Sequence, residues 1–148
     1  MTNSGTDCPA RLVLDTSAFS RFRAGHETVL ELIAAAEAVL LPVTVLGELE
    51  AGFELGTRAR ANRLALADFM EEPFVSIIPT TLEVAKRYGL SFADLRRAGT
   101  PVPVNDIWIA AATWTSGACL VTFDQHFRKF TGLPCLILED TGTEASCL

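Results

Sequence analysis

The feature that most constrains the fold is a short apolar run that ends in an acid. Residues 11–17 read Arg-Leu-Val-Leu-Asp-Thr-Ser. Three branched apolar residues without helical spacing are typical of a strand buried on both faces, as in a parallel sheet. Residues 119–124 repeat the plan and end in Asp124. Because ligands of open α/β sheets bind beyond the carboxyl ends of the strands, Asp15 and Asp124 lie where a functional site is expected.

The rest of the chain alternates between strand-like and helix-like segments. We expect further strands at 39–43, 74–79 and 133–138, and helices at 26–39, 45–55, 58–70, 82–88, 92–98 and 106–114. The expected N-caps are Thr44, Thr80 or Thr81, Ser91 and Asn105, and the expected stops are Gly56, Gly99 and Gly117. This alternation predicts one α/β domain, residues 11–140, in which helices flank a central, mostly parallel sheet. A flexible leader (1–10) and a polar tail (141–148) would flank it.

Composition narrows the class of protein. The chain has 148 residues, 49% hydrophobic and 20% charged, enough apolar surface for one folded core and too much for a disordered chain. No apolar run is long enough to span a bilayer and no secretory signal is evident, so we expect a cytoplasmic protein without a membrane partner. The four cysteines form no CxxC pair, so a zinc site is not predicted; Cys119 and Cys135 fit core thiols.

Four acids are predicted to meet at one edge of the sheet. Asp15 and Asp124 follow strands, and Asp106 begins a helix that can point to the same edge. Glu48 is preferred to Glu50, because small residues share its side of the helix. Crowded carboxylates repel one another unless they are protonated or share a cation, and hard oxygen ligands suit Mg²⁺ or Mn²⁺.

Phosphodiester hydrolysis fits such a site. One or two divalent ions can hold a phosphodiester, activate a water and stabilise the leaving oxygen without a histidine or a covalent nucleophile. Polar neighbours of the acids would orient water or phosphate; these are Thr16, Ser17, Asn105 and Thr122. The net charge of −6 argues against broad attraction to nucleic acid but does not exclude a nuclease, because a bound ion inverts the local charge.

Each acid also has a structural explanation. Asp15 and Asp124 can be turn or N-cap residues, Asp106 can favour the positive end of a helix dipole, and Glu48 can be a solvated helix residue. Their convergence on one edge favours the functional interpretation. The other candidates are weak: His26 and His126 fit a surface and a turn position, and the two tryptophans have helical spacing that predicts packing.

With these residues assembled, the chain resembles PIN domains of the VapC type, the toxins of bacterial toxin–antitoxin pairs. The resemblance covers residues 11–140 and rests on four motifs in order: Leu-Asp-Thr-Ser at 14–17, Thr-Val-Leu-Gly-Glu-Leu-Glu-Ala-Gly at 44–52, the run 99–111 around Asn105 and Asp106, and Leu-Val-Thr-Phe-Asp-Gln-His-Phe at 120–127.

The resemblance implies a Mg²⁺- or Mn²⁺-dependent endoribonuclease that cuts RNA, halts translation, forms a homodimer and is covered by a cognate antitoxin. It implies that Asp15, Glu48, Asp106 and Asp124 bind the metal, with Thr16, Ser17, Asn105 and Thr122 in support.

Some arginines are candidates for contacts with RNA phosphates, although solvated helix faces explain them equally well; they are Arg58, Arg60, Arg63, Arg96 and Arg97. Two other classes of function remain open. A receiver-like signalling module would also bind Mg²⁺ with clustered acids, but neither Lys86 nor Lys129 follows a strand as such a module requires. A non-catalytic scaffold that only binds its partner would keep its cellular effect in an Asp106→Asn variant.

Overall fold

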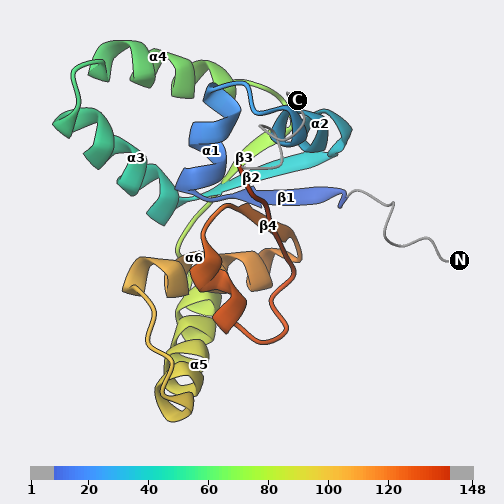
Figure 1. The fold of residues 1–148 in the computed structure, drawn as a ribbon, viewed down its shortest axis with the longest axis vertical. Coiled ribbons are helices and arrows are strands. Elements are labelled where there is room, and N and C mark those ends of the chain that lie inside the picture. The colour runs from blue at the N-terminus through green and yellow to red at the C-terminus, as the bar shows by residue number, and fades with distance from the viewer. Residues whose placement is uncertain (1–8, 141–148) are drawn as a thin grey trace, which may run out of the picture.

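A five-stranded sheet in which every neighbouring pair of strands is parallel forms the centre of the structure (Figure 1). The computed structural model describes residues 9–140, so the predicted leader, apart from Pro9 and Ala10, and the predicted tail lie outside the described residues. In spatial order β3-β2-β1-β4-β5, the strands are β3 (Val75–Ile78), β2 (Ala38–Pro42), β1 (Arg11–Leu14), β4 (Cys119–Thr122) and β5 (Cys135–Ile137).

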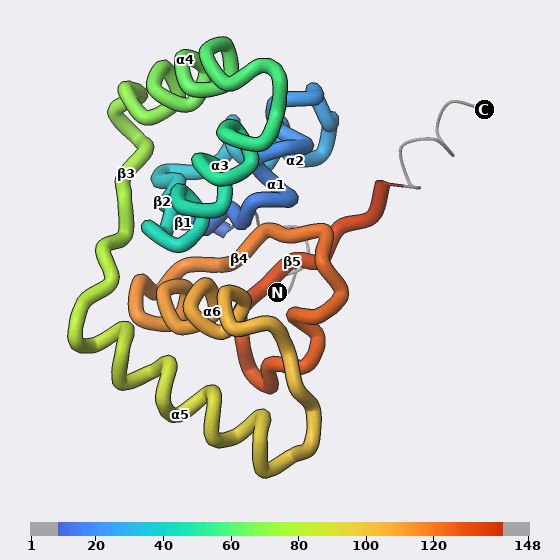
Figure 2. The backbone as a smooth tube through the Cα atoms, turned by 90° about the vertical axis from the view of Figure 1, so that its left-hand side faces the viewer, coloured from blue at the N-terminus to red at the C-terminus, as the bar shows by residue number. Residues whose placement is uncertain are grey.

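Helices cover both faces of the sheet, as the two views show (Figures 1 and 2). The first four lie on one side and α5 and α6 on the other. They are α1 (Thr16–Arg23), α2 (Glu27–Ala35), α3 (Val43–Leu55), α4 (Ala59–Met70), α5 (Leu82–Ala98) and α6 (Val104–Ser116), with a 3₁₀ helix η2 (Gln125–Lys129). This architecture confirms the predicted α/β class. Within residues 9–140, no helix is both long and apolar enough to cross a bilayer.

The central strands are buried on both faces because helices cover them from both sides. Leu12, Val13 and Leu14 of β1 are completely inaccessible to solvent, and so are Leu120 and Val121 of β4. At about 25 cal/mol per Å² of apolar surface, a side chain buried in this way contributes roughly 1.5–3 kcal/mol. The apolar runs that predicted these strands therefore also supply the middle of the core.

The order of the strands creates a switch point between β1 and β4. From β1 the chain crosses through α1 and α2 to β2 on one side, whereas β4 reaches the other side of β1 from β3 through α5 and α6. The register pairs Leu14 with Val121, so the residues after them, Asp15 and Thr122, emerge side by side. In open α/β sheets this is where ligands bind.

The first crossover differs from the prediction. Residues 16–23 form α1, where the sequence predicted no element, and the helix expected at 26–39 is α2, which ends at Ala35. Val39 belongs to β2 and is completely buried. The predicted helix was too long because the apolar residues of the strand that follows continue the spacing of the helix's apolar face for one more turn.

Ser91 is not an N-cap, because the two helices expected at 82–88 and 92–98 are one helix, α5. Its N-cap is Thr81, as predicted, whose hydroxyl accepts the Val84 N–H at 3.3 Å. Ser91 is only 5% exposed. A serine inside a helix resembles a cap in sequence, although here it lies buried within a continuous helix.

Prolines replace two other predicted caps. Pro42 and Pro103 occupy the N-cap positions of α3 and α6 without a side-chain capping bond, so these helices begin before Thr44 and Asn105. Both prolines have φ near −60°, which the ring fixes and which leads into a helix. The predicted stops of α5 and α6 are confirmed: Gly99 and Gly117 adopt φ of 70° and 67°, where a side chain would be strained.

The tryptophans pack as predicted. Trp108 on α6 stacks on Tyr88 of α5, with ring centroids 4.0 Å apart, and Trp114 meets Phe130 edge-on. Cys119 and Cys135 are free, half-buried thiols on the adjacent strands β4 and β5, and burial raises the pKa of Cys119 to about 11. The two tryptophans and the two cysteines therefore contribute to packing.

Candidate functional site

A groove of about 550 Å³ lies at the carboxyl edge of the sheet. It is lined by Asp15, Thr16, Ser17, Glu48, Ala51, Gly52, Leu55, Asp106, Ile109 and Asp124. The structure therefore brings all four predicted acids into one concave surface. Larger or more enclosed cavities elsewhere carry no comparable set of carboxylates.

Asp15 is fixed by three hydrogen bonds. Its Oδ1 accepts the Ser17 hydroxyl at 2.7 Å and the Ala18 N–H at 2.9 Å, which makes it the N-cap of α1, and its Oδ2 accepts the Thr122 hydroxyl at 2.5 Å. Burial raises the pKa of Asp15 above its usual range, and these bonds, which favour the ionised form, oppose that rise. Asp15 therefore both caps α1 and lines the groove.

Thr122 connects the two acids that follow β1 and β4. Its completely buried hydroxyl donates to Asp15 and accepts the Asp124 N–H at 2.9 Å. Ser17 makes a parallel link, because its hydroxyl accepts the Phe123 N–H at 2.9 Å while it donates to Asp15. Two hydroxyls thus hold the strand ends in register.

Glu48 is held by neighbours from two other helices. Its Oε1 accepts the Thr16 hydroxyl at 2.5 Å, and its Oε2 accepts the Asn105 side-chain amide at 3.0 Å. Asn105 therefore orients a carboxylate where the sequence suggested a cap. Glu50 points elsewhere and forms an ion pair with Arg63 at 2.7 Å, so the structure places Glu48, not Glu50, in the groove.

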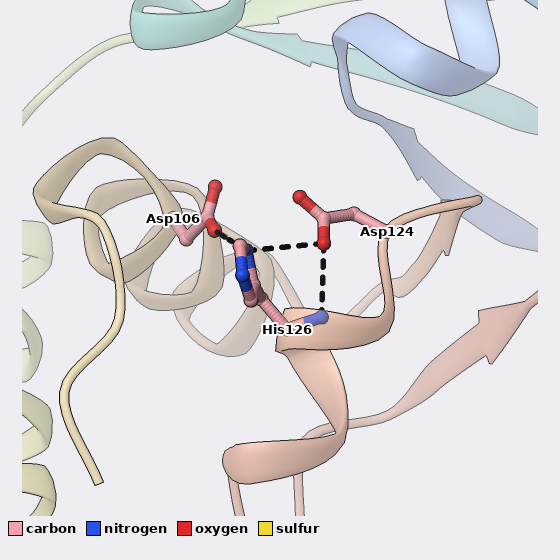
Figure 3. A group of neighbouring side chains, drawn as sticks. All are labelled: Asp106, Asp124 and His126. Atoms are coloured by element: carbon pink, nitrogen blue, oxygen red, sulfur yellow. Dashed lines mark hydrogen bonds and ion pairs between the residues drawn. The ribbon is translucent and has the colours of Figure 1, made fainter.

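Asp106 and Asp124, which line the groove, form a cluster with the neighbouring His126 (Figure 3). His126 Nδ1 lies 3.1 Å from Asp124 Oδ1 and 3.5 Å from Asp106 Oδ2. The backbone N–H of His126 also donates to Asp124 Oδ1 at 2.9 Å, which caps η2. The three side chains can offer ligand atoms within 4.8 Å of one another.

Asp106 is the acid whose burial is least compensated by hydrogen bonds. The residue is 8% exposed, and its Oδ2 is buried without a hydrogen-bond partner. Burial first, and then the Asp124 carboxylate, raises the pKa of Asp106 to about 6. A buried carboxylate oxygen without a hydrogen-bond donor, in a residue whose pKa nearby acids raise, is the setting in which a divalent cation is favourable, so the residues present fit a metal ion.

The predicted arginines lie outside this groove. Arg63 is engaged by Glu50 and Glu54, Arg97 lies 3.7 Å from Asp94, and Arg96 lies over the Phe92 ring. Arg58 lines a separate pocket beside Phe19 and Leu49. Arg60 is on α4, and none of the five lines the groove. A role in RNA contact therefore stays a prediction.

His126 is the site residue that sequence reasoning missed. It was expected in a turn, and the structure places it instead in the 3₁₀ helix η2, with its ring between two acids. The available signal was its position two residues after Asp124. A capping aspartate accepts the backbone N–H of the residue at that position, which brings the side chain of the same residue close to the carboxylate.

Comparisons with known proteins give a consistent result. A family model described as PIN domain matches residues 12–133. Ribonuclease VapC5 of Mycobacterium tuberculosis is 30% identical over 126 residues, which cover 84% of this chain and 90% of that protein.

Solved structures share the fold. VapBC-5 of Mycobacterium tuberculosis, a member of the VapBC family of toxin-antitoxin systems, has a chain that is 28% identical with a TM-score of 0.68, covering 88% of this chain and 99% of that one. A chain of VapBC2 from Rickettsia felis, bound to a DNA fragment from their promoter, is 22% identical with a TM-score of 0.77, covering 87% and 99%.

Proposed function

Since the chain belongs to the PIN domain family, we propose that it is a metal-dependent endoribonuclease that acts as the toxin of a toxin–antitoxin pair. The observation that carries the proposal is the groove lined by four carboxylates, one of which, Asp106, has a buried oxygen without a hydrogen-bond partner. The 30% identity to a named ribonuclease over most of both chains supports the same activity.

The metal would be held by Asp15, Glu48, Asp106 and Asp124, and Mg²⁺ or Mn²⁺ suits these hard oxygen ligands. When bound, such an ion supplies Lewis acid chemistry: it positions a phosphodiester, lowers the pKa of an attacking water and stabilises the leaving oxygen. Hydrolysis in this form needs no covalent nucleophile from the protein.

The residues around the acids position them for this task. Ser17 and Thr122 donate hydrogen bonds that orient the Asp15 carboxylate. Thr16 and Asn105 do the same for the Glu48 carboxylate. Hydroxyl and amide donors that fix ligand carboxylates in this way limit their rotation before substrate binds, which reduces the reorganisation required during the reaction.

An antitoxin is the expected protein partner, because related chains are found in VapBC complexes. The wall of the groove includes the small and apolar residues Ala51, Gly52 and Leu55 beside the acids. Leu55 is 88% exposed. An amphipathic antitoxin segment that places apolar side chains on this wall and a basic side chain against the carboxylates would cover the site. A homodimer is proposed from the family resemblance.

The test is cleavage of total cellular RNA by purified protein with Mg²⁺ or Mn²⁺, and with EDTA. Discrete fragments that require metal are expected from the wild type, with a loss of at least about 100-fold for Asp106→Asn. Asp94→Asn is the matched control, because Asp94 is an exposed aspartate that pairs with Arg97 outside the groove. Equal cleavage by wild type and Asp106→Asn would refute the proposal.

A further inference from the structure

We propose that His126 binds the metal ion directly through Nδ1, so that the site has a nitrogen ligand beside its carboxylates and favours Mn²⁺ over Mg²⁺. The inference rests on the proposed function and deepens it. Four acids alone would make an all-oxygen site, which suits Mg²⁺ well. An imidazole ligand moves the preference toward transition metals, because Mg²⁺ gains little from a softer nitrogen donor.

The spacing of the cluster is the first support. Two atoms that bind one ion at about 2.1 Å lie about 3.0 Å apart at a right angle and at most about 4.2 Å apart. His126 Nδ1 is 3.1 Å from Asp124 Oδ1 and 3.5 Å from Asp106 Oδ2, both inside this range. The imidazole therefore lies where it can bind the ion that these two carboxylates share.

The second support is the orphaned oxygen of Asp106. The side chain of Asp106 is 12% exposed, and its buried Oδ2, which has no hydrogen-bond partner, is the atom from which the 3.5 Å distance to His126 Nδ1 is measured. No other cationic side chain of the described residues forms an ion pair with Asp106 at 4 Å or less. An ion placed between Oδ2 and Nδ1 would give the oxygen its missing partner.

The third support is how the ring is held. The His126 N–H is bonded to Asp124 Oδ1, so the backbone of the histidine is fixed to a second predicted ligand. Its side chain is 48% exposed, so an ion from solvent can reach the ring. Figure 3 shows the ring directed at the space between the two carboxylates.

Electron spin-echo spectroscopy of bound Mn²⁺ tests the inference at about pH 8, where an ordinary imidazole is neutral. We expect ¹⁴N coupling in the wild type and its loss in His126→Gln. The sequence contains only two histidines, so His26→Gln is the matched control and should keep the coupling. Calorimetry should show at least about tenfold weaker Mn²⁺ binding in His126→Gln, with a smaller loss for Mg²⁺.

The outcomes separate the two proposals. If the wild type binds no Mn²⁺, the metal-dependent nuclease fails. If it binds Mn²⁺ without ¹⁴N coupling, and His126→Gln binds equally well, the oxygen-only site stands and nitrogen ligation is overturned. Because His126 is exposed at the surface, its replacement should leave the fold intact, which circular dichroism of each variant verifies.

Discussion

Asp106 is the residue at which stability and site chemistry oppose each other. Its pKa is about 6 in the folded chain and about 3.9 in an unfolded one. Between these values the folded state holds a proton that the unfolded state has lost, so stability falls as pH rises. Below about pH 4 the ionisation of Asp106 does not destabilise the folded state. Above about pH 6 the destabilisation is complete and amounts to at most about 3 kcal/mol.

We therefore predict that Asp106→Asn raises the free energy of unfolding at pH 7.5 and leaves it almost unchanged at about pH 4, although it lowers cleavage at least about 100-fold. Urea titrations of both proteins in EDTA at several pH values measure this. Asp94→Asn, at an exposed site, should show no such pH-dependent gain. A variant less stable than wild type at pH 7.5 would contradict the assigned cost of ionisation.

Thr122 makes a second prediction at this scale. Thr122→Val keeps the shape of the side chain but removes the hydroxyl that Asp15 and the Asp124 amide share. We expect a loss of about 1–3 kcal/mol in stability and at least about tenfold in cleavage rate. Thr113→Val is the matched control: Thr113 is equally buried and its hydroxyl donates to the Ile109 carbonyl of the same helix, so stability alone should change.

At the scale of elements, caps distinguish the real start of α5 from the false one. Thr81→Ala removes the bond to the Val84 amide and should cost about 1 kcal/mol, whereas Ser91→Ala, inside the helix, should be neutral or slightly stabilising. Thr80→Ala, next to the cap and exposed, controls for the loss of a threonine. Thermal denaturation measures the stability of all three variants. A clear loss of stability in Ser91→Ala would contradict the conclusion that Ser91 does not cap a helix.

The sequence was sufficient where one pattern had one structural meaning. Apolar runs that end in an acid predicted β1 and β4, and with them the edge where Asp15 and Asp124 lie. It was insufficient where one residue type serves two purposes. Ser91 looked like a cap because serine is favoured there, and α1 was overlooked because Asp15 was interpreted as a site residue although it also caps that helix.

His126 could not be placed from sequence alone, because its neighbours in space come from different elements. Asp106 lies on α6, and Asp124 follows β4. Only the packing of α6 against η2 brings the histidine to both carboxylates. Periodicity reports which face of an element is apolar, but not which loops meet beyond a sheet edge.

At the scale of the whole molecule, crowded acids make metal binding a stabilising event. An ion that binds only the folded state adds about 2.7 kcal/mol at a concentration one hundred times its dissociation constant. We predict that Mn²⁺ raises the melting temperature of the wild type and not that of Asp106→Asn, as measured by thermal denaturation with and without EDTA. An equal rise in both proteins would show that the ion binds elsewhere.

The adjacency of β1 and β4 has a consequence for how the protein is made. Asp15 and Asp124 meet through strands that are neighbours in space but far apart in the sequence. A ribosome must therefore add 109 residues after Asp15 to reach Asp124 before the four carboxylates can gather. If the chain cuts RNA, a prematurely released fragment that stops before β4 is harmless to the cell that produced it.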